Sequence, residues 1–225
     1  MNIISFDTAR ATWLFPLEEF TPAAGASSPS ILGEIGNKYG FARLPQITTR
    51  EDMAKNGLPF GMGSFEIEGH RIIITDFIVY NDGIAAVAEK TEWAEKFLED
   101  IVPWVRDSFG FRDVSSGIRK LYSSTLIVDF ERPLSRLLSA YERISGIISS
   151  RTVMLIPDRP PLQFSRLDFE VDKTAVIGQA VPPKFILERR AGVGFSQERY
   201  YSLAPMHTSS HIDALIEIEK LAAEG

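Results

Sequence analysis

The stretch from Ser64 to Phe109 constrains the fold more than any other part of the chain, because its hydrophobic pattern changes from strand to helix periodicity. Three segments with strand patterns come first: residues 64–68, 71–80 and 84–89. Two turn signals separate them: Gly69-His70 and Asn81-Asp82-Gly83. A helix is then expected from Thr91, since apolar residues recur on one face up to residue 109. This order predicts an antiparallel three-stranded meander with a helix against it.

Similar signals occur on both sides of this meander. Before it, the sequence predicts a strand within residues 8–20, a helix from Ser28 to Gly40 and a short helix over residues 50–56. After it, the sequence predicts a strand at 123–131, a helix over 133–148, strands at 153–156, 162–171, 184–190 and 199–203, and a last helix from Ser210. A strand-turn-helix arrangement is therefore expected twice, near residues 71–109 and 123–148.

These elements predict the α+β class, with a broad, mostly antiparallel sheet and helices packed mainly on one face. The 225 residues suit a single domain spanning residues 1–225, and a subdivision near residues 110–120 is the alternative. The two similar strand-turn-helix units leave an internal duplication open, although their residues do not match one another.

Composition excludes several classes of protein. Cysteine is absent, so disulfides, thiolate metal sites and cysteine nucleophiles are ruled out. No signal-peptide pattern and no apolar run long enough to span a bilayer are visible, so we expect a cytoplasmic protein that does not associate with membranes. The formal net charge of −6 and the lack of a basic block argue against nucleic acid as a partner.

Two of the three histidines, His207 and His211, are four residues apart, a spacing that binds metal when both lie on one helix. The intervening Thr-Ser-Ser is typical of a helix start, which would put His207 outside the helix. We therefore expect two solvated histidines at a helix entry, with a metal site as the alternative, because zinc normally needs a third protein ligand. His70 falls in a predicted turn and is expected to be exposed.

Asp76 is the most informative carboxylate, because the predicted strand 71–80 is apolar on both faces. On this strand Asp76 shares a face with Ile72, Ile74 and Ile78, so we expect it to be partly buried. A partly buried carboxylate belongs either to a binding site or to a structural ion pair.

A row of alternating charges lies on the predicted strand 162–171 and its end: Arg166, Asp168, Glu170 and Asp172. We interpret it as the solvated face of an amphipathic strand. A cation site is the alternative, but oxygens in a straight row do not converge on an ion.

The segment 184–201 is rich in arginine and tyrosine, a combination that is common in interfaces. Four of its side chains are candidates for binding: Arg189, Arg190, Arg199 and Tyr200. The alternative is that they form cross-strand pairs with Glu188 and Glu198, which would hold a hairpin in register.

Motifs for catalysis or cofactor binding are missing from the sequence. The glycines at 57, 61 and 63 have neither dinucleotide nor P-loop spacing, and no Gly-x-Ser-x-Gly elbow is present. We therefore expect no cofactor and a non-catalytic interaction or regulatory protein, which acts through a protein partner or self-association. Two alternatives remain open: a small-ligand-binding protein or enzyme with a sheet–helix pocket around Asp76, and a metal-dependent hydrolase that uses His207 and His211.

Overall fold

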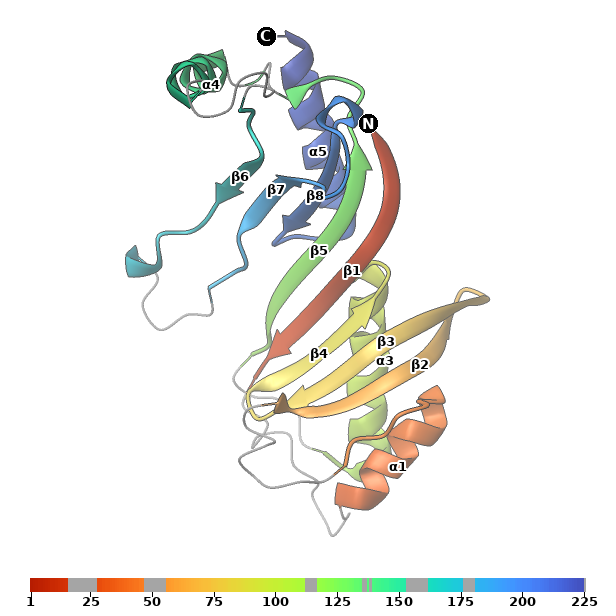
Figure 1. The fold of residues 1–225 in the computed structure, drawn as a ribbon. Coiled ribbons are helices and arrows are strands. Elements are labelled where there is room, and N and C mark those ends of the chain that lie inside the picture. The colour runs from red at the N-terminus through yellow and green to blue at the C-terminus, as the bar shows by residue number, and fades with distance from the viewer. Residues whose placement is uncertain are drawn as a thin grey trace. The chain divides into compact units, whose positions relative to one another are not determined.

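The computed structural model describes residues 1–15, 28–46, 56–111, 117–134, 137, 139–152, 162–175 and 181–224. The described strands are β1 (Asn2–Leu14), β2 (Leu58–Ile67), β3 (His70–Tyr80), β4 (Gly83–Ala88), β5 (Arg119–Asp129), β6 (Arg166–Phe169), β7 (Phe185–Arg189) and β8 (Arg199–Ala204). The described α-helices are α1 (Ser28–Tyr39), α3 (Thr91–Phe109), α4 (Ser139–Thr152) and α5 (Thr208–Glu224). These elements confirm the predicted α+β class (Figure 1).

The strands form one eight-stranded sheet in the order β2-β3-β4-β1-β5-β8-β7-β6. Apart from short 3₁₀ turns, the described elements follow one order twice: strand, helix, three strands, helix. The elements from β1 to α3 give this order first, and those from β5 to α5 repeat it. The hydrogen-bonded order also repeats, as β2-β3-β4-β1 and β6-β7-β8-β5. In this repeat, β5 and α4 take the places of β1 and α1, so its bounds differ from those of the expected strand-turn-helix units.

Contacts divide the chain into two compact units. The N-terminal unit comprises Asp7–Ser124 and Pro205–Thr208, and the C-terminal unit comprises Met1–Phe6, Thr125–Ala204 and Ser209–Gly225. Strand β1 therefore begins in the C-terminal unit and ends in the N-terminal unit, whereas β5 does the reverse.

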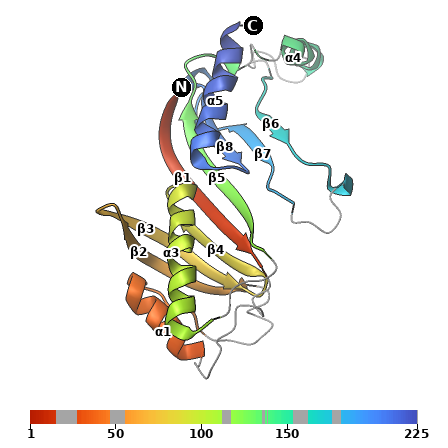
Figure 2. The same cartoon turned by 180° about the vertical axis from the view of Figure 1, so that it is seen from behind.

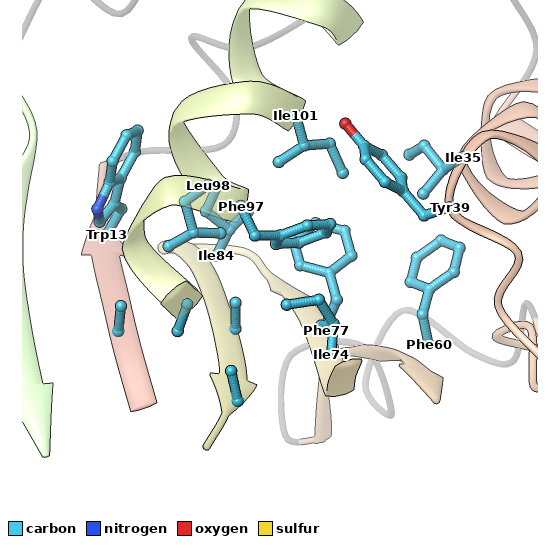
Figure 3. Close-up of a cluster of buried hydrophobic side chains, with 14 of the residues drawn as sticks. Trp13, Ile35, Tyr39, Phe60, Ile74, Phe77, Ile84, Phe97, Leu98 and Ile101 are labelled. Atoms are coloured by element: carbon cyan, nitrogen blue, oxygen red, sulfur yellow. The ribbon is translucent and has the colours of Figure 1, made fainter. Parts of the chain in front are cut away.

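Aromatic rings fill the core of the N-terminal unit. Helices α1 and α3 cover the same face of the β2-β3-β4 meander (Figure 2). Phe97 of α3 lies at the centre, with its ring centroid 4.9 Å from that of Tyr39 and 5.3 Å from that of Phe77. Figure 3 shows these rings meeting between the helices and the strands. The interface between sheet and helices in this unit is therefore packed with side chains.

The first hairpin differs from its prediction by one residue. Its turn is Glu68-Gly69, and both residues have positive φ angles, 50° and 78°, as a two-residue type I′ turn requires. His70 is therefore not in the turn: it is the exposed first residue of β3, paired with Ile67. Strand β2 also starts earlier than predicted, at Leu58.

The core of the C-terminal unit is smaller and packs α5 against strands. Leu126, Val128, Leu187, Tyr200 and Leu215 are at most 1% exposed there. Figures 1 and 2 both show α4 standing apart from β7 and β8. Helix α4 begins at Ser139 instead of Pro133, and α5 begins at Thr208 instead of Ser210.

Some sequence predictions fall on residues outside the described ranges. They are residues 16–20 of the first predicted strand, most of the helix at 50–56, and the strand at 153–156. Within the described part of the chain, no helix is both long and apolar enough to cross a membrane.

Candidate functional site

Asp76 forms an ion pair at the edge of the sheet. It lies on β3 opposite Gly61 of β2, and the Arg43 guanidinium donates a hydrogen bond of 3.4 Å to its Oδ1. Arg43 is held there by its backbone, because its N–H and C=O both bond to Gly61. A Cβ at Gly61 would meet the Arg43 guanidinium in its present position, so any larger residue would displace the end of this side chain. The backbone therefore positions this pair.

The face that Asp76 occupies differs from the expected one. Ile72, Ile74 and Phe77 all lie in the same buried cluster, so the inward-facing side of β3 changes between residues 74 and 77. Successive strand residues point to opposite faces, so Asp76 points away from buried Phe77. Its side chain is 36% exposed, and it does not share the buried face of Ile72 and Ile74.

A cleft of about 680 Å³ opens beside this ion pair. Arg43, Gln46 and Asp76 contribute polar groups to its lining, and Leu44, Pro45 and Pro59 contribute apolar surface. The cleft runs along edge strand β2, whereas the expected position between sheet and helices is filled by aromatic rings. Its volume falls in the range of pockets that hold small molecules.

Two of the arginine and tyrosine candidates are buried in the C-terminal unit. Arg189 is 9% exposed, and its guanidinium donates to the backbone carbonyls of Phe164 and Phe195 and to the Glu198 carboxylate. Tyr200 is fully buried and donates to Glu198 Oε2 at 2.8 Å. Burial and this hydrogen bond raise the pKa of the Tyr200 phenol. These side chains hold the β7–β8 hairpin together from inside.

The other two candidates differ from each other. Arg199 binds the Asp129 carboxylate through two parallel hydrogen bonds of 2.7 and 2.8 Å. The hydrogen bond from Arg199 holds the pKa of Asp129 below its usual value, against the effect of burial. Arg190 is exposed, so of the four candidates only its side chain lies mainly in solvent.

His211 is buried, not solvated as expected. It lies on the first turn of α5, is fully buried, and its Nε2 is 2.8 Å from Ser202 Oγ on β8. Burial lowers the pKa of its imidazole to about 4. Both side chains are inaccessible to solvent, so we interpret this pair as part of the core of the C-terminal unit.

His207 joins a polar cluster that the sequence did not reveal. Its ring lies 3.9 Å from that of Tyr122, and its Nε2 is 3.8 Å from Glu95 Oε2. Glu95 accepts hydrogen bonds from Tyr122 and Lys120 at 2.7 and 2.8 Å. Burial opposes ionisation of Glu95, but the two hydrogen bonds together have the larger effect and lower the pKa of its carboxyl group. Within the described residues, no group of three or more metal-ligating side chains is placed to hold an ion.

The charged residues on and after β6 form ion pairs with one another and with residues on and just before β7. Arg166 binds Asp168 at 2.6 Å and Glu188 of β7 at 3.3 Å, and Lys184 binds Glu170 at 3.0 Å. Two of the three carboxylates of the row, Asp168 and Glu170, therefore have basic partners, and Asp172 accepts hydrogen bonds from Thr174. Exposed pairs of this kind are expected on a solvated strand face.

Helix α4 has an exposed apolar surface. Ile144 and Ile148 recur at core spacing, but they are 49% and 44% exposed, and Ile147 between them is 56% exposed. We call these three residues the α4 stripe. Helical spacing of apolar residues does not tell which of them the rest of the chain covers.

Comparison with known proteins does not extend these observations: no protein-family model matches the chain, and no curated protein matches it significantly.

Proposed function

We propose that this chain is a non-catalytic interaction protein that associates with a second copy of itself through the α4 stripe. The observation that carries the proposal is the exposure of the stripe, about half of each isoleucine. A helix at the surface of a globular protein normally turns such a stripe toward its own core. An exposed apolar patch is typical of an interaction site.

Helix α1, which has the same place in the repeated element order, supports this interpretation. Its apolar residues Ile31, Ile35 and Tyr39 are only 9%, 5% and 3% exposed. One chain therefore contains both a helix that buries its stripe within its own unit and a helix that leaves it in water. The second arrangement costs solvation free energy unless another surface covers the stripe.

A second copy suits the stripe because the contact would be self-complementary. In a two-fold dimer the same patch lies on both subunits, and an apolar stripe is its own complement. Arg143 is the one charged residue at positions 143–150, so two stripes can meet without a row of like charges.

Leu162 is a further exposed apolar residue beside α4. It is 44% exposed, and its N–H donates to Ser149 Oγ of α4 at 3.0 Å. Ser145 of α4 also donates to its carbonyl oxygen. Even with Leu162 the patch is far smaller than the roughly 20–30 residues a side of a standard interface. We therefore expect weak, concentration-dependent association.

Sedimentation velocity over a concentration series tests the proposal. We expect the sedimentation coefficient of the native protein to rise between about 1 and 200 µM, in the range of weak interfaces. Combining Ile144→Ser and Ile147→Ser should give a monomer at all of these concentrations, because it replaces apolar contact area with hydroxyl groups.

Ile73→Ser provides the matched control. Ile73 is 48% exposed on β3, so the substitution removes an equally exposed isoleucine from the other unit. It should leave the concentration dependence unchanged. A native protein that stays monomeric at every concentration would refute self-association, as would a double variant that associates like the native protein.

A further inference from the structure

We propose that the cleft beside β2 binds a free α-amino acid with an apolar side chain, through Arg43 and Asp76. The site is separate from α4 and lies wholly in the N-terminal unit. The inference stands on three features of the cleft: an exposed cation, a carboxylate next to it, and an apolar wall of suitable size.

Arg43 supplies an anion-binding group with unused donors. A guanidinium carries five N–H groups, and in the described part of the chain its one side-chain hydrogen bond is the 3.4 Å contact with Asp76. The side chain is 70% exposed at the cleft. A carboxylate is the group that this planar fork binds best, because two parallel N–H···O bonds can form.

Asp76 supplies the complementary acceptor. Its Oδ1 faces Arg43, and Oδ2 has no hydrogen bond to a described residue. Because the carboxylate stands 3.4 Å from the cation, a ligand with adjacent positive and negative groups can contact both at once. The carboxylate and ammonium of an α-amino acid share one carbon atom and so meet this requirement. A ligand with one charge would leave one member of the pair unmatched.

The remaining lining selects an apolar side chain. Leu44, Pro45 and Pro59 form a wall close to the ion pair, and the cleft volume of about 680 Å³ leaves room for a branched or aromatic group. The backbone bridge between Arg43 and Gly61 fixes the point from which the Arg43 side chain extends before a ligand arrives. Such preorganisation reduces the entropy lost on binding.

Three probes separate the contributions of the two charges: L-leucine, isocaproate, which lacks the ammonium, and isoamylamine, which lacks the carboxylate. We would titrate each into ¹⁵N-labelled full-length protein and follow amide shifts by NMR. L-leucine should shift the Gly57 and Gly61 amides saturably. Each of the other probes should bind at least about tenfold more weakly, as expected for loss of one charged contact.

Three variants complete the test. Arg43→Gln and Asp76→Asn should each weaken leucine binding by about tenfold or more, and the same spectra report whether the fold is intact. Arg71→Gln is the control, because Arg71 is an exposed arginine on β3 that bonds to Ser64, outside the cleft. It should bind leucine as the native protein does.

Three results would overturn the proposal. The first is no saturable shift at Gly57 or Gly61 with leucine. The second is full-strength binding of isocaproate or isoamylamine, and the third is leucine binding that Arg43→Gln leaves unchanged. In the last two cases the paired charges would not recognise the ligand.

Discussion

The two units contain the same order of secondary structure but fill their cores differently. In the N-terminal unit the space between helices and meander is occupied by rings, with Phe97 in contact with Tyr39, Phe41, Phe65 and Phe77. In the C-terminal unit the core includes polar side chains, namely the Arg189–Glu198 ion pair and the His211–Ser202 hydrogen bond. One topology is therefore compatible with a core stabilised by close packing of apolar side chains and with a core stabilised partly by hydrogen bonds.

This difference predicts different sensitivities. A ring core responds to lost volume. It hardly responds to pH, because phenylalanine does not titrate and burial raises the pKa of the Tyr39 phenol further above its ordinary value. A core with buried charges responds to any change that leaves one charge unmatched. Trp13, Trp93 and Trp104 all belong to the N-terminal unit, so tryptophan fluorescence reports on that unit alone.

The largest effect is expected from Phe97→Ala. It leaves a cavity among four other rings and should lower the free energy of unfolding by about 3–5 kcal/mol. Urea unfolding followed by tryptophan fluorescence measures the loss. Ile73→Ala is the control, because Ile73 of β3 lies in the same unit and is 48% exposed, and it should change the free energy by less than about 1 kcal/mol. A loss below 1 kcal/mol for Phe97→Ala would mean that the rings are not tightly packed.

Glu198→Gln should destabilise the C-terminal unit by about 3 kcal/mol, because it leaves the Arg189 charge buried without its carboxylate. Hydrogen exchange of the β7 and β8 amides would detect this loss. Adding Arg189→Met removes the uncompensated charge and should restore part of the stability. If the double variant is less stable than Glu198→Gln alone, the guanidinium contributes mainly through its bonds to backbone carbonyls.

Acid should also weaken the C-terminal unit. The pKa of His211 is about 4 in the folded protein and 6.5 in the unfolded chain, so the unfolded state binds more protons between these values. The stability due to neutral His211 is complete above pH 6.5 and decreases as the pH falls toward 4. The total loss is about 3 kcal/mol.

Comparison with His211→Gln isolates this effect, because glutamine can bond Ser202 without titrating. Hydrogen exchange of β8 amides should show a pH-dependent stability difference between the two proteins over this window. His70→Gln, at an exposed position, should retain the native pH dependence. If the native protein loses no stability relative to His211→Gln between pH 6.5 and 4, the imidazole of His211 is not buried in its neutral form.

The sequence predicted the elements whose signals are local. The Asn81-Asp82-Gly83 turn and the stripe of α3 specified β3, β4 and α3 to within a residue. Strand β2 was underestimated because its glycines at 61 and 63 resemble a loop. They are needed in a strand here because Arg43 and the Phe41 ring occupy the space of their missing side chains.

The candidate site could not be predicted from the sequence, because it is formed by contacts between segments far apart in the chain. Arg43 reaches Asp76 from 33 positions away, so no spacing rule connects them. His211 lies in a helix-start segment that usually faces water, and it is buried because β8 passes beside it. The exposed α4 stripe has the same periodicity as a buried one. In each case the missing information is which other segment packs against the residue.

The smallest expected effect concerns a feature that joins the starts of two equivalent helices, α3 and α5. The Thr91 N–H donates to Thr208 Oγ1 at 3.0 Å, and the Thr208 N–H donates to Thr91 Oγ1 at 2.7 Å. Each threonine therefore caps the helix that the other one begins. Both are buried, so water cannot replace a lost cap.

Thr208→Val and Thr91→Val should each cost about 1–2 kcal/mol, because each leaves one buried N–H without an acceptor. The two hydroxyls are also 3.2 Å apart, so each single substitution disturbs the other cap. The double variant should therefore lose less than the sum of the two single losses, by at least about 0.5 kcal/mol. Urea unfolding followed by tryptophan fluorescence gives the free energies for this double-mutant cycle, since both residues belong to the N-terminal unit. Strictly additive losses would show that the two caps act independently.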